Sequence, residues 1–170
     1  EVSCWETALD GTEVAAVEDD LMSHHGIAKP YSEWCLDFDG TNDYVDCGTG
    51  IGDALGDNYA GDLTVSLWFK SDATSDSDGL FAISDFSSSS GPFHVRTSGN
   101  ALDYRIASAA WTRTVAFTDT TNWNHLACVY KGGSESDSKM YLNGVSTGTT
   151  SGTFPAASAM DFAGLKTTIG

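Results

Sequence analysis

The chain has 170 residues, a length that suits one globular domain of ordinary size. Asp and Glu number 24 against 8 for Lys and Arg, so the formal net charge is −16. A surface that negative repels phosphate backbones, which excludes nucleic acid as a partner. No apolar run approaches the roughly 18 residues that a membrane-spanning helix needs, so no span is predicted.

Most of the acidic residues are aspartates, with 18 Asp against 6 Glu. Glu is the better helix former, whereas Asp is favoured in turns and in oxygen-ligand sites for hard cations. The excess of Asp therefore predicts a loop-rich fold. Calcium binding and a salty environment are two open explanations for it.

In chain order, residues 1–33 are predicted to form an N-terminal strand and loop. They precede a core over residues 34–170, and the whole of 1–170 is predicted to be a single domain. One short helix is expected, either in residues 15–23 or in residues 52–59.

Past residue 40 the apolar residues recur with a period of two, which is typical of β-strands with one buried face. The pattern is clearest in residues 63–69 (LTVSLWF). Shorter runs of the same kind follow, with Gly, Asn, Asp or Ser at their ends: 80–84, 93–97, 102–106, 114–118, 125–130 and 140–142. Regularly spaced short strands with turn residues between them predict an all-β, antiparallel two-sheet sandwich.

Two turn sequences predict hairpins within this sandwich. Asn143-Gly144 is a strong signal for a type I′ turn, and residues 39–43 (DGTND) have alternating apolar residues on both sides. Residues 71–79, 86–91, 132–139 and 148–153 are predicted as loops. Trp68, Phe69 and Trp123 are expected to supply apolar area between the two sheets.

Four motifs occur in a fixed order along the chain. They are residues 36–45 (LDFDGTNDYV), 63–69 (LTVSLWF), 123–127 (WNHLA) followed by 140–144 (MYLNG), and 168–170 (TIG). Together they resemble the motifs of laminin-G-like domains, which are concanavalin A-like jelly-roll modules related more distantly to the pentraxins. The resemblance implies a jelly-roll fold and an extracellular module that binds other molecules.

Modules of this kind usually continue with a further strand after the motif that ends at Gly170. Without that strand, one sheet edge would be unpaired and prone to aggregation. The N-terminal segment, a strand from a partner chain, or sequence beyond Gly170 would each fill it, and the sequence does not choose among them.

Four cysteines, Cys4, Cys35, Cys47 and Cys128, allow three complete disulfide pairings. If the hairpin over 39–43 pairs symmetrically about Thr41, Cys35 and Cys47 face each other and can bond, and Cys4–Cys128 would tie the N-terminal strand to the sheet. A register shifted by one residue puts Cys35 and Cys47 on opposite sides. The alternative is four small buried thiols.

Asp39, Asn42 and Asp43 place three oxygen-bearing side chains on one turn, and calcium takes such ligands. In the modules that this chain resembles, a calcium ion often lies at this end of the sandwich. Asp20 and Asp161 are further candidate ligands from neighbouring loops. The alternative is that these residues serve the turn conformation alone.

A sugar-binding face is predicted from aromatic and polar side chains on two successive predicted strands: Tyr104, Arg105, Trp111 and Arg113. Exposed aromatic rings stack on sugars, while charged groups bond to the hydroxyls. This interpretation places Trp111 at the tip of a loop. The alternative is that Trp111 closes the core.

A glycoside hydrolase needs two carboxylates that flank the scissile bond. Glu135-Ser136-Asp137 is a Glu-x-Asp sequence, but no second Glu follows it, and it lies in the polar stretch 132–139. The sequence therefore predicts a protein that is not an enzyme.

The predicted function is a non-catalytic extracellular binding or adhesion module that binds calcium and recognises a glycan or a protein surface. The main alternative is a structural building block of a filament, virion or cell-surface assembly. Such a block would associate through self-assembly or strand exchange, and the composition rich in Asp, Ser, Thr and Gly suits it.

Overall fold

The computed structural model describes residues 35–39, 43–73, 77–84, 91–107, 110–156 and 160–170. The chain divides into two compact units, Glu1–Asp37 and Phe38–Gly170. The fold that follows is that of the second unit.

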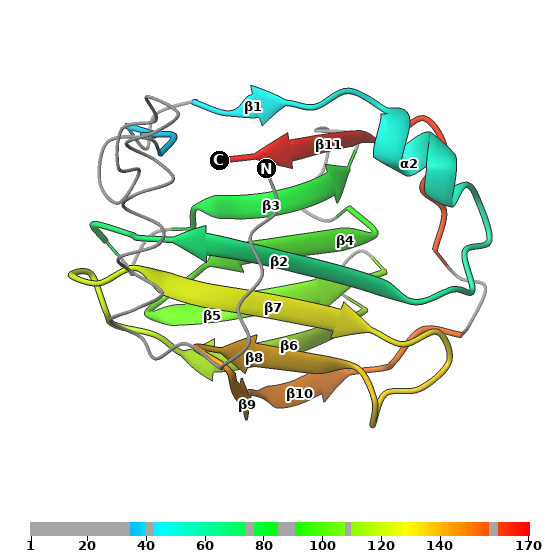
Figure 1. The fold of residues 1–170 in the computed structure, drawn as a ribbon. Helices are drawn as coiled ribbons and strands as arrows, with labels where there is room; N and C mark the ends of the chain where they lie inside the picture. The colour runs from blue at the N-terminus through cyan, green and yellow to red at the C-terminus, as the bar shows by residue number, and fades with distance from the viewer. Residues whose placement is uncertain (1–34, 40–42, 74–76, 85–90, 108–109, 157–159) are drawn as a thin grey trace, which may run out of the picture. The chain divides into compact units, whose positions relative to one another are not determined.

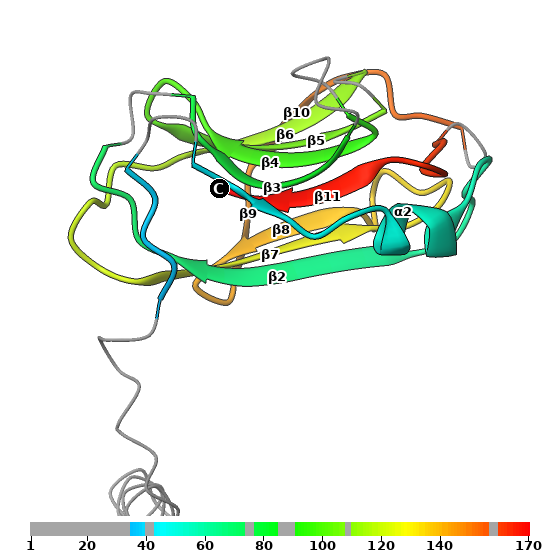
Figure 2. The ribbon, with the colours of Figure 1, turned by 90° about the horizontal axis from the view of Figure 1, so that it is seen from above.

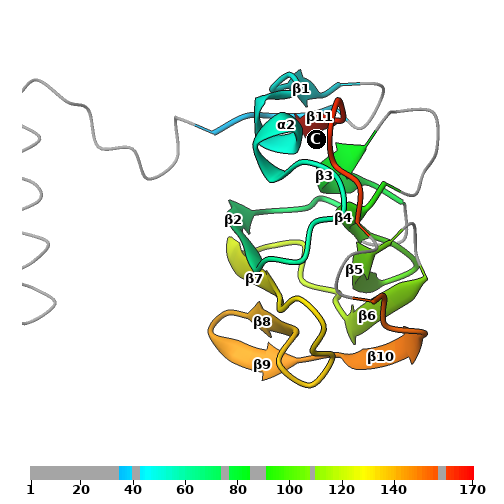
Figure 3. The ribbon, with the colours of Figure 1, turned by 90° about the vertical axis from the view of Figure 1, so that its right-hand side faces the viewer.

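The described strands form two antiparallel sheets that face each other (Figure 1, Figure 3). One sheet has seven strands in the order β1-β11-β3-β4-β5-β6-β10, and the other has four in the order β2-β7-β8-β9. The elements are β1 (Val45–Asp46), α2 (Gly50–Leu55), β2 (Leu63–Phe69), β3 (Gly79–Ser84), β4 (Phe93–Thr97), β5 (Ala101–Ile106), β6 (Trp111–Ala116), β7 (Asn124–Tyr130), β8 (Lys139–Leu142), β9 (Val145–Thr147), β10 (Thr149–Gly152) and β11 (Lys166–Ile169). The predicted two-sheet antiparallel sandwich is confirmed.

Most of the predicted strands are confirmed to within one residue. β2 and β4 have the predicted bounds, and β3, β5, β7 and β8 each begin one residue earlier. β6 begins at Trp111, three residues before its predicted start. The predicted loop 148–153 instead contains β10, because Thr150 of this hydroxyl-rich segment pairs with Arg113 of β6.

The two predicted hairpins have different outcomes. Asn143 and Gly144 have φ angles of 51° and 79°, and β8 pairs with β9 across them, which confirms the type I′ turn. The hairpin predicted over 39–43 is wrong, because β1 takes β11 as its partner, with Val45 opposite Ile169. β11 thus has β1 on one side and β3 on the other, so it is not the unpaired edge.

The core between the sheets is built on aromatic side chains. Trp111 makes edge-to-face contacts with Tyr104 and Phe154, at centroid distances of 5.6 and 5.2 Å. Its Nε1 donates a hydrogen bond of 2.9 Å to Glu135 on the loop between β7 and β8. The Arg113 guanidinium lies 5.6 Å from the Trp111 ring centroid and donates to the Ser138 and Gly148 carbonyls. Side chains of the seven-stranded sheet, of the loop between β7 and β8 and of the segment after β10 therefore converge on Trp111.

No disulfide joins the three cysteines that the structure describes. Cys35 and Cys47 carry exposed free thiols, and Cys128 carries a buried free thiol. Cys4 lies outside the described residues. Burial raises the pKa of the Cys128 thiol far above its usual range, so this side chain serves as a small apolar core residue.

We expect Trp111→Ala to lower the free energy of unfolding by about 3–5 kcal/mol, because it leaves a cavity where both sheets meet. Trp68→Ala is the matched control: Trp68 is 66% exposed, so its loss should cost no more than about 0.5 kcal/mol. Urea denaturation followed by tryptophan fluorescence measures both. Equal losses in the two variants would contradict the placement of Trp111 in the core.

Candidate binding surface

The predicted sugar-stacking face is wrong for three of its four residues. Tyr104 and Trp111 are fully buried, and Arg113 is directed into the sandwich against the Trp111 ring. The cause is the start of β6 at Trp111, which turns this residue toward the core instead of placing it at a loop tip. The alternative that Trp111 closes the core is confirmed. Arg105 lies on the outer face of the same sheet.

The predicted calcium ligands are only partly brought together. Asp39 and Asp43 lie close together, because the Asp39 backbone N–H donates a 3.2 Å hydrogen bond to Asp43 Oδ2. Asn42 and Asp20 lie outside the described residues. Within the described ranges, no three His, Cys, Asp or Glu side chains are grouped so that they could hold a metal ion.

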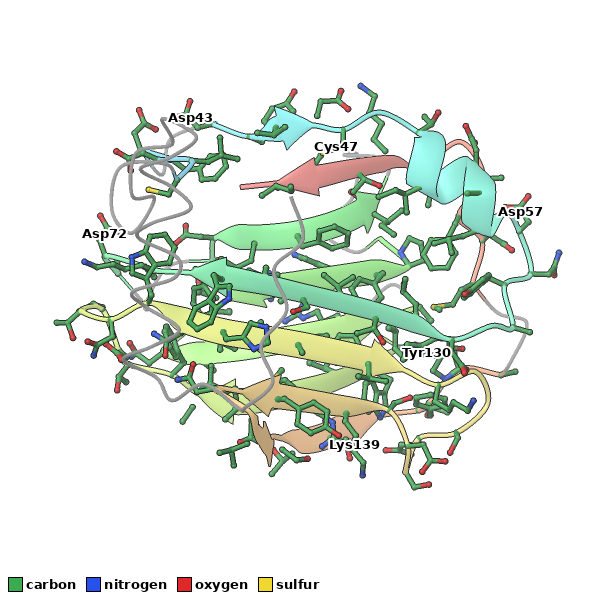
Figure 4. The ribbon with its side chains drawn as sticks, viewed as in Figure 1. Asp43, Cys47, Asp57, Asp72, Tyr130 and Lys139 are labelled. Carbon is green, nitrogen blue, oxygen red and sulfur yellow. The ribbon has the colours of Figure 1, made fainter. Side chains whose placement is uncertain are left out.

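Asp161 belongs to the other end of the sandwich, so its prediction as a ligand beside Asp43 is wrong. Its Oδ1 accepts a 2.9 Å hydrogen bond from the Asn58 backbone N–H. Nearby, Ala163 N–H donates to Asp57, and Figure 4 shows Asp57 and Asp43 at opposite ends of the segment that contains β1 and α2. Asp161 therefore fixes the loop that follows α2.

Both carboxylates of the Glu-x-Asp sequence 135–137 accept hydrogen bonds from side chains of the fold. Glu135 accepts the hydrogen bond from Trp111, and Asp137 accepts one of 2.7 Å from the Ser134 hydroxyl. Both lie on the loop between β7 and β8, not on a strand where two carboxylates could flank a glycosidic bond.

Two tryptophans are exposed, Trp68 on the outer face of the four-stranded sheet and Trp123 directly before β7. Trp68 is 66% exposed and Trp123 is 44% exposed, so the prediction that they lie between the sheets is wrong. Phe69, predicted with them, is buried as expected. Alternation along β2 directs Leu63, Val65, Leu67 and Phe69 inward and Trp68 outward.

Trp68 is held against the neighbouring strand. It lies opposite His125 of β7, with ring centroids 5.1 Å apart. Ser66, on the same face of β2, forms a 2.7 Å hydrogen bond with His125 Nε2. Trp123, which is 44% exposed, directly precedes β7, two residues before His125. We call Ser66, Trp68, Trp123 and His125 the aromatic surface.

Hydrogen bonds from the β8–β9 turn fix this part of β7. Asn143 Oδ1 accepts from the His125 N–H at 2.9 Å, and the Asn143 N–H donates to the His125 carbonyl at 2.8 Å. Asn143 Nδ2 also donates to Asn124 Oδ1, and Asn124 Nδ2 donates to the Asn122 carbonyl. Asn124 is almost fully buried, and these bonds satisfy its amide.

The loop before Trp123 is organised by one carboxylate. Asp119 Oδ1 accepts hydrogen bonds from the backbone N–H groups of Thr121 and Asn122, at 2.9 and 3.1 Å. The Asn122 side-chain amide also donates to it. These donors favour the ionised form, with the Asn122 side chain contributing most, and hold the pKa of Asp119 well below its usual range.

The aromatic surface combines exposed rings with polar groups. Exposed indole rings can stack on a partner, and Ser66 and His125 supply polar groups beside them. The His125 ring contacts no carboxylate among the described residues. The Ser66–His125 pair therefore lacks the third group that orients the base in a serine hydrolase.

The fold defines the chain as a two-sheet antiparallel β-sandwich protein. A laminin G family model, described as the Concanavalin A-like lectin/glucanases superfamily, matches residues 39–167. The chain belongs to this family, as its motifs predicted. Domains of the family generally bind proteins or glycans and are usually extracellular, so the chain is a binding module in this general sense.

Among solved structures, domains LG4-5 of the mouse laminin alpha1 chain are similar, with 12% identity and a TM-score of 0.46. The match covers 84% of this chain and 39% of the laminin chain. No curated protein matches the sequence. Over the described part of the chain, every helix is too short or too polar to cross a membrane.

We expect stability to fall as the pH drops below about 4, the ordinary Asp pKa. A carboxyl whose pKa is lower in the folded state stabilises the fold above its unfolded pKa, and this contribution is lost as the pH falls through the folded value. Asp119 is such a group, as are Asp46, Asp53 and Asp62. Urea midpoints between pH 7 and pH 2 measure the effect. The deficit of Asp119→Ala relative to wild type should shrink on acidification, and a constant deficit would contradict the role of this carboxylate.

Proposed function

We propose that this chain is a non-catalytic extracellular module that recognises a glycan through the aromatic surface. The observation that carries the proposal is Trp68, which is two-thirds exposed and lies near the end of the edge strand β2, in continuous register with β7. Its ring is positioned by His125, and His125 is fixed by Ser66 and Asn143. An exposed and positioned indole is costly to keep in water and provides a ready stacking partner.

A glycan is preferred to a protein partner because polar groups surround the indole. Ser66 and His125 lie beside it, and the cross-strand positions beyond Ala127 are occupied by Tyr141 and Ser146. Stacked rings with hydroxyl and imidazole groups nearby match a sugar, which has an apolar face of C–H bonds and a rim of hydroxyls.

The proposal that the module is not an enzyme is supported by the two carboxylates of the Glu-x-Asp sequence, because both accept hydrogen bonds from neighbouring side chains. Glu135 holds Trp111, and Asp137 holds Ser134. The extracellular assignment is supported by the family, whose domains usually work outside the cell. A cell surface and a virion surface are both consistent with it.

A second function, a building block of a filament, virion or cell-surface assembly, is favoured by β2. This strand is at the edge of the four-stranded sheet, and no described residue pairs with its free side. Its sequence LTVSLWF contains no charge and no proline, and its register with β7 is continuous. Edges without such protection pair readily with strands of other chains.

Calcium binding is proposed for Asp39 and Asp43, with Asn42 as a third ligand. The hydrogen bond that brings Asp43 to the Asp39 backbone supports it, together with the resemblance to calcium-binding modules. Asp161 is not included, because it is bonded to Asn58 at the other end of the sandwich.

Trp68→Ala should weaken glycan binding at least about tenfold, equivalent to about 1.4 kcal/mol, because it removes the stacking ring. A glycan array identifies the ligand, and calorimetry gives the affinities of wild type and variant. Ile51→Ala is the control, since Ile51 is an exposed apolar residue on α2. Binding that is unchanged in Trp68→Ala would contradict the aromatic surface. No glycan binding, with light scattering that grows with protein concentration, would favour the building-block function.

Calcium should raise the melting temperature of the wild-type protein, since a ligand that binds only the folded state stabilises it. The rise should vanish with EDTA and in Asp43→Asn, but persist in Asp161→Asn, which has the same charge change. Thermal unfolding by calorimetry measures all three. A wild-type melting temperature that is the same with calcium and with EDTA would contradict this site.

A further inference from the structure

The free side of β2 presents backbone groups that the described strands leave unpaired. His125 of β7 directs both its N–H and its C=O toward Asn143, on the side of β8. These groups change sides from one residue of a strand to the next, so Leu126 directs its own toward β2, opposite Leu67. Every second residue of β2 therefore points its N–H and C=O away from β7. These residues are Thr64, Ser66 and Trp68.

The apolar core is open along the same edge. Leu63, Val65 and Leu67 point inward from β2 but are only half-buried. The inward side chains of the neighbouring strand β7 are instead fully buried, and they are Leu126, Cys128 and Tyr130. The core is thus closed over β7 and incomplete beside β2. Apolar side chains placed beside β2 would gain both hydrophobic and dispersion energy.

The seven-stranded sheet extends past this edge. Figures 1 and 3 both place β11 and β1 beyond β2. Ile169 of β11 shares a strand face with Thr167, which lies opposite the fully buried Ile83, yet Ile169 is 36% exposed. Figure 2 looks onto this edge and shows α2 at one end of it. The rest of the edge is a position for one further strand beside β2.

A second copy of the chain does not fit this position. If β2 paired with β2 of another copy, the two four-stranded sheets would become continuous, and the wider seven-stranded sheets behind them would overlap. Each copy also has a net charge of −16, so two copies repel each other. A single extended strand avoids both the overlap and the repulsion.

Carboxylates lie around the two ends of the edge. Figure 4 shows Asp72 beside one end of β2, with Asp43 and Asp57 at opposite ends of the segment that contains β1 and α2. Lysine or arginine residues at the ends of an added strand would be attracted to these carboxylates, whereas acidic residues would be repelled. The charges therefore favour a strand with basic ends.

We propose that β2 binds an extended segment of a partner protein that has apolar residues at alternate positions and basic residues at its ends. Partner residues opposite Thr64, Ser66 and Trp68 exchange backbone hydrogen bonds with them, and their side chains face outward. The residues between them direct apolar side chains into the open part of the core. The inference rests on the building-block function proposed for β2 and names the kind of strand that this edge takes.

The test measures binding of a synthetic peptide to the full chain by calorimetry. The peptide has valines alternating with threonines between two terminal lysines, and its alternating part matches the seven residues of β2. Methylation of the threonine backbone nitrogens should weaken binding at least about tenfold, because it removes the donors directed at β2. Methylation of as many valine nitrogens is the matched control. It should leave most of the affinity, since those nitrogens point away from β2.

Thr64→Pro tests the same contact from the side of the protein. It removes an N–H on the free edge without removing a hydrogen bond to β7, and should weaken peptide binding at least about tenfold. Thr64→Ala keeps the N–H and should bind the peptide as wild type does. Thermal unfolding shows whether both variants are folded. If Thr64→Pro is not, the methylated peptides decide, because they need only the wild-type protein.

Three results would overturn the proposal. They are no binding of the peptide by wild type, equal binding of a scrambled peptide with the same terminal lysines, and an equal loss with the two methylated peptides. Light scattering separates this failure from that of the building-block function. A protein that binds no peptide but still assembles as its concentration rises would retain that function and exclude this edge as the strand site.

Discussion

The packing of Trp111 between the two sheets is the constraint on which the arrangement of the sandwich depends. Trp111 is the first residue of β6 and is fully buried, so it fixes which side chains of that strand face inward. Arg113 then lies over the indole and bonds to the Ser138 and Gly148 carbonyls, which ties the ends of β8 and β10 to β6. The same alternation directs Thr112 and Thr114 outward, where Thr114 contacts Asp103.

Both candidate binding surfaces follow from the way the two sheets are stacked. A sandwich of two sheets uses its inner faces for the core, so recognition is left to the outer faces, the loops and the sheet edges. The four-stranded sheet presents aromatic rings that Ser66 and Asn143 position through His125. The same sheet ends at β2, whose inward apolar side chains are only half-buried. Strands carry most of the side chains of each surface, including Trp68 and His125 on β2 and β7.

The aspartates around α2 accept hydrogen bonds that stabilise the fold, a role that composition alone did not predict. Asp53 accepts from the Thr49 hydroxyl and the Gly164 N–H, Asp57 accepts from Ala163, and Asp161 accepts from Asn58. The Thr49 hydroxyl, followed by the Gly164 N–H, lowers the pKa of Asp53. These carboxylates satisfy backbone donors in the loops around α2, which is the turn chemistry that favours Asp over Glu.

The sequence alone predicts the strands, the sandwich and the type I′ turn at Asn143-Gly144, because apolar periodicity and the conformational preferences of turn residues are local properties. It also identified the family through motifs on those strands. The burial of Trp111 and the exposure of Trp68 and Trp123 follow from tertiary packing. The sequence does not predict them, because an aromatic residue is compatible with either face of a strand. Likewise, the pairing of β1 with β11 and of β10 with β6 depends on strands far apart in the chain. The open edge of β2 arises in the same way, because these distant pairings make the seven-stranded sheet wider than the four-stranded one.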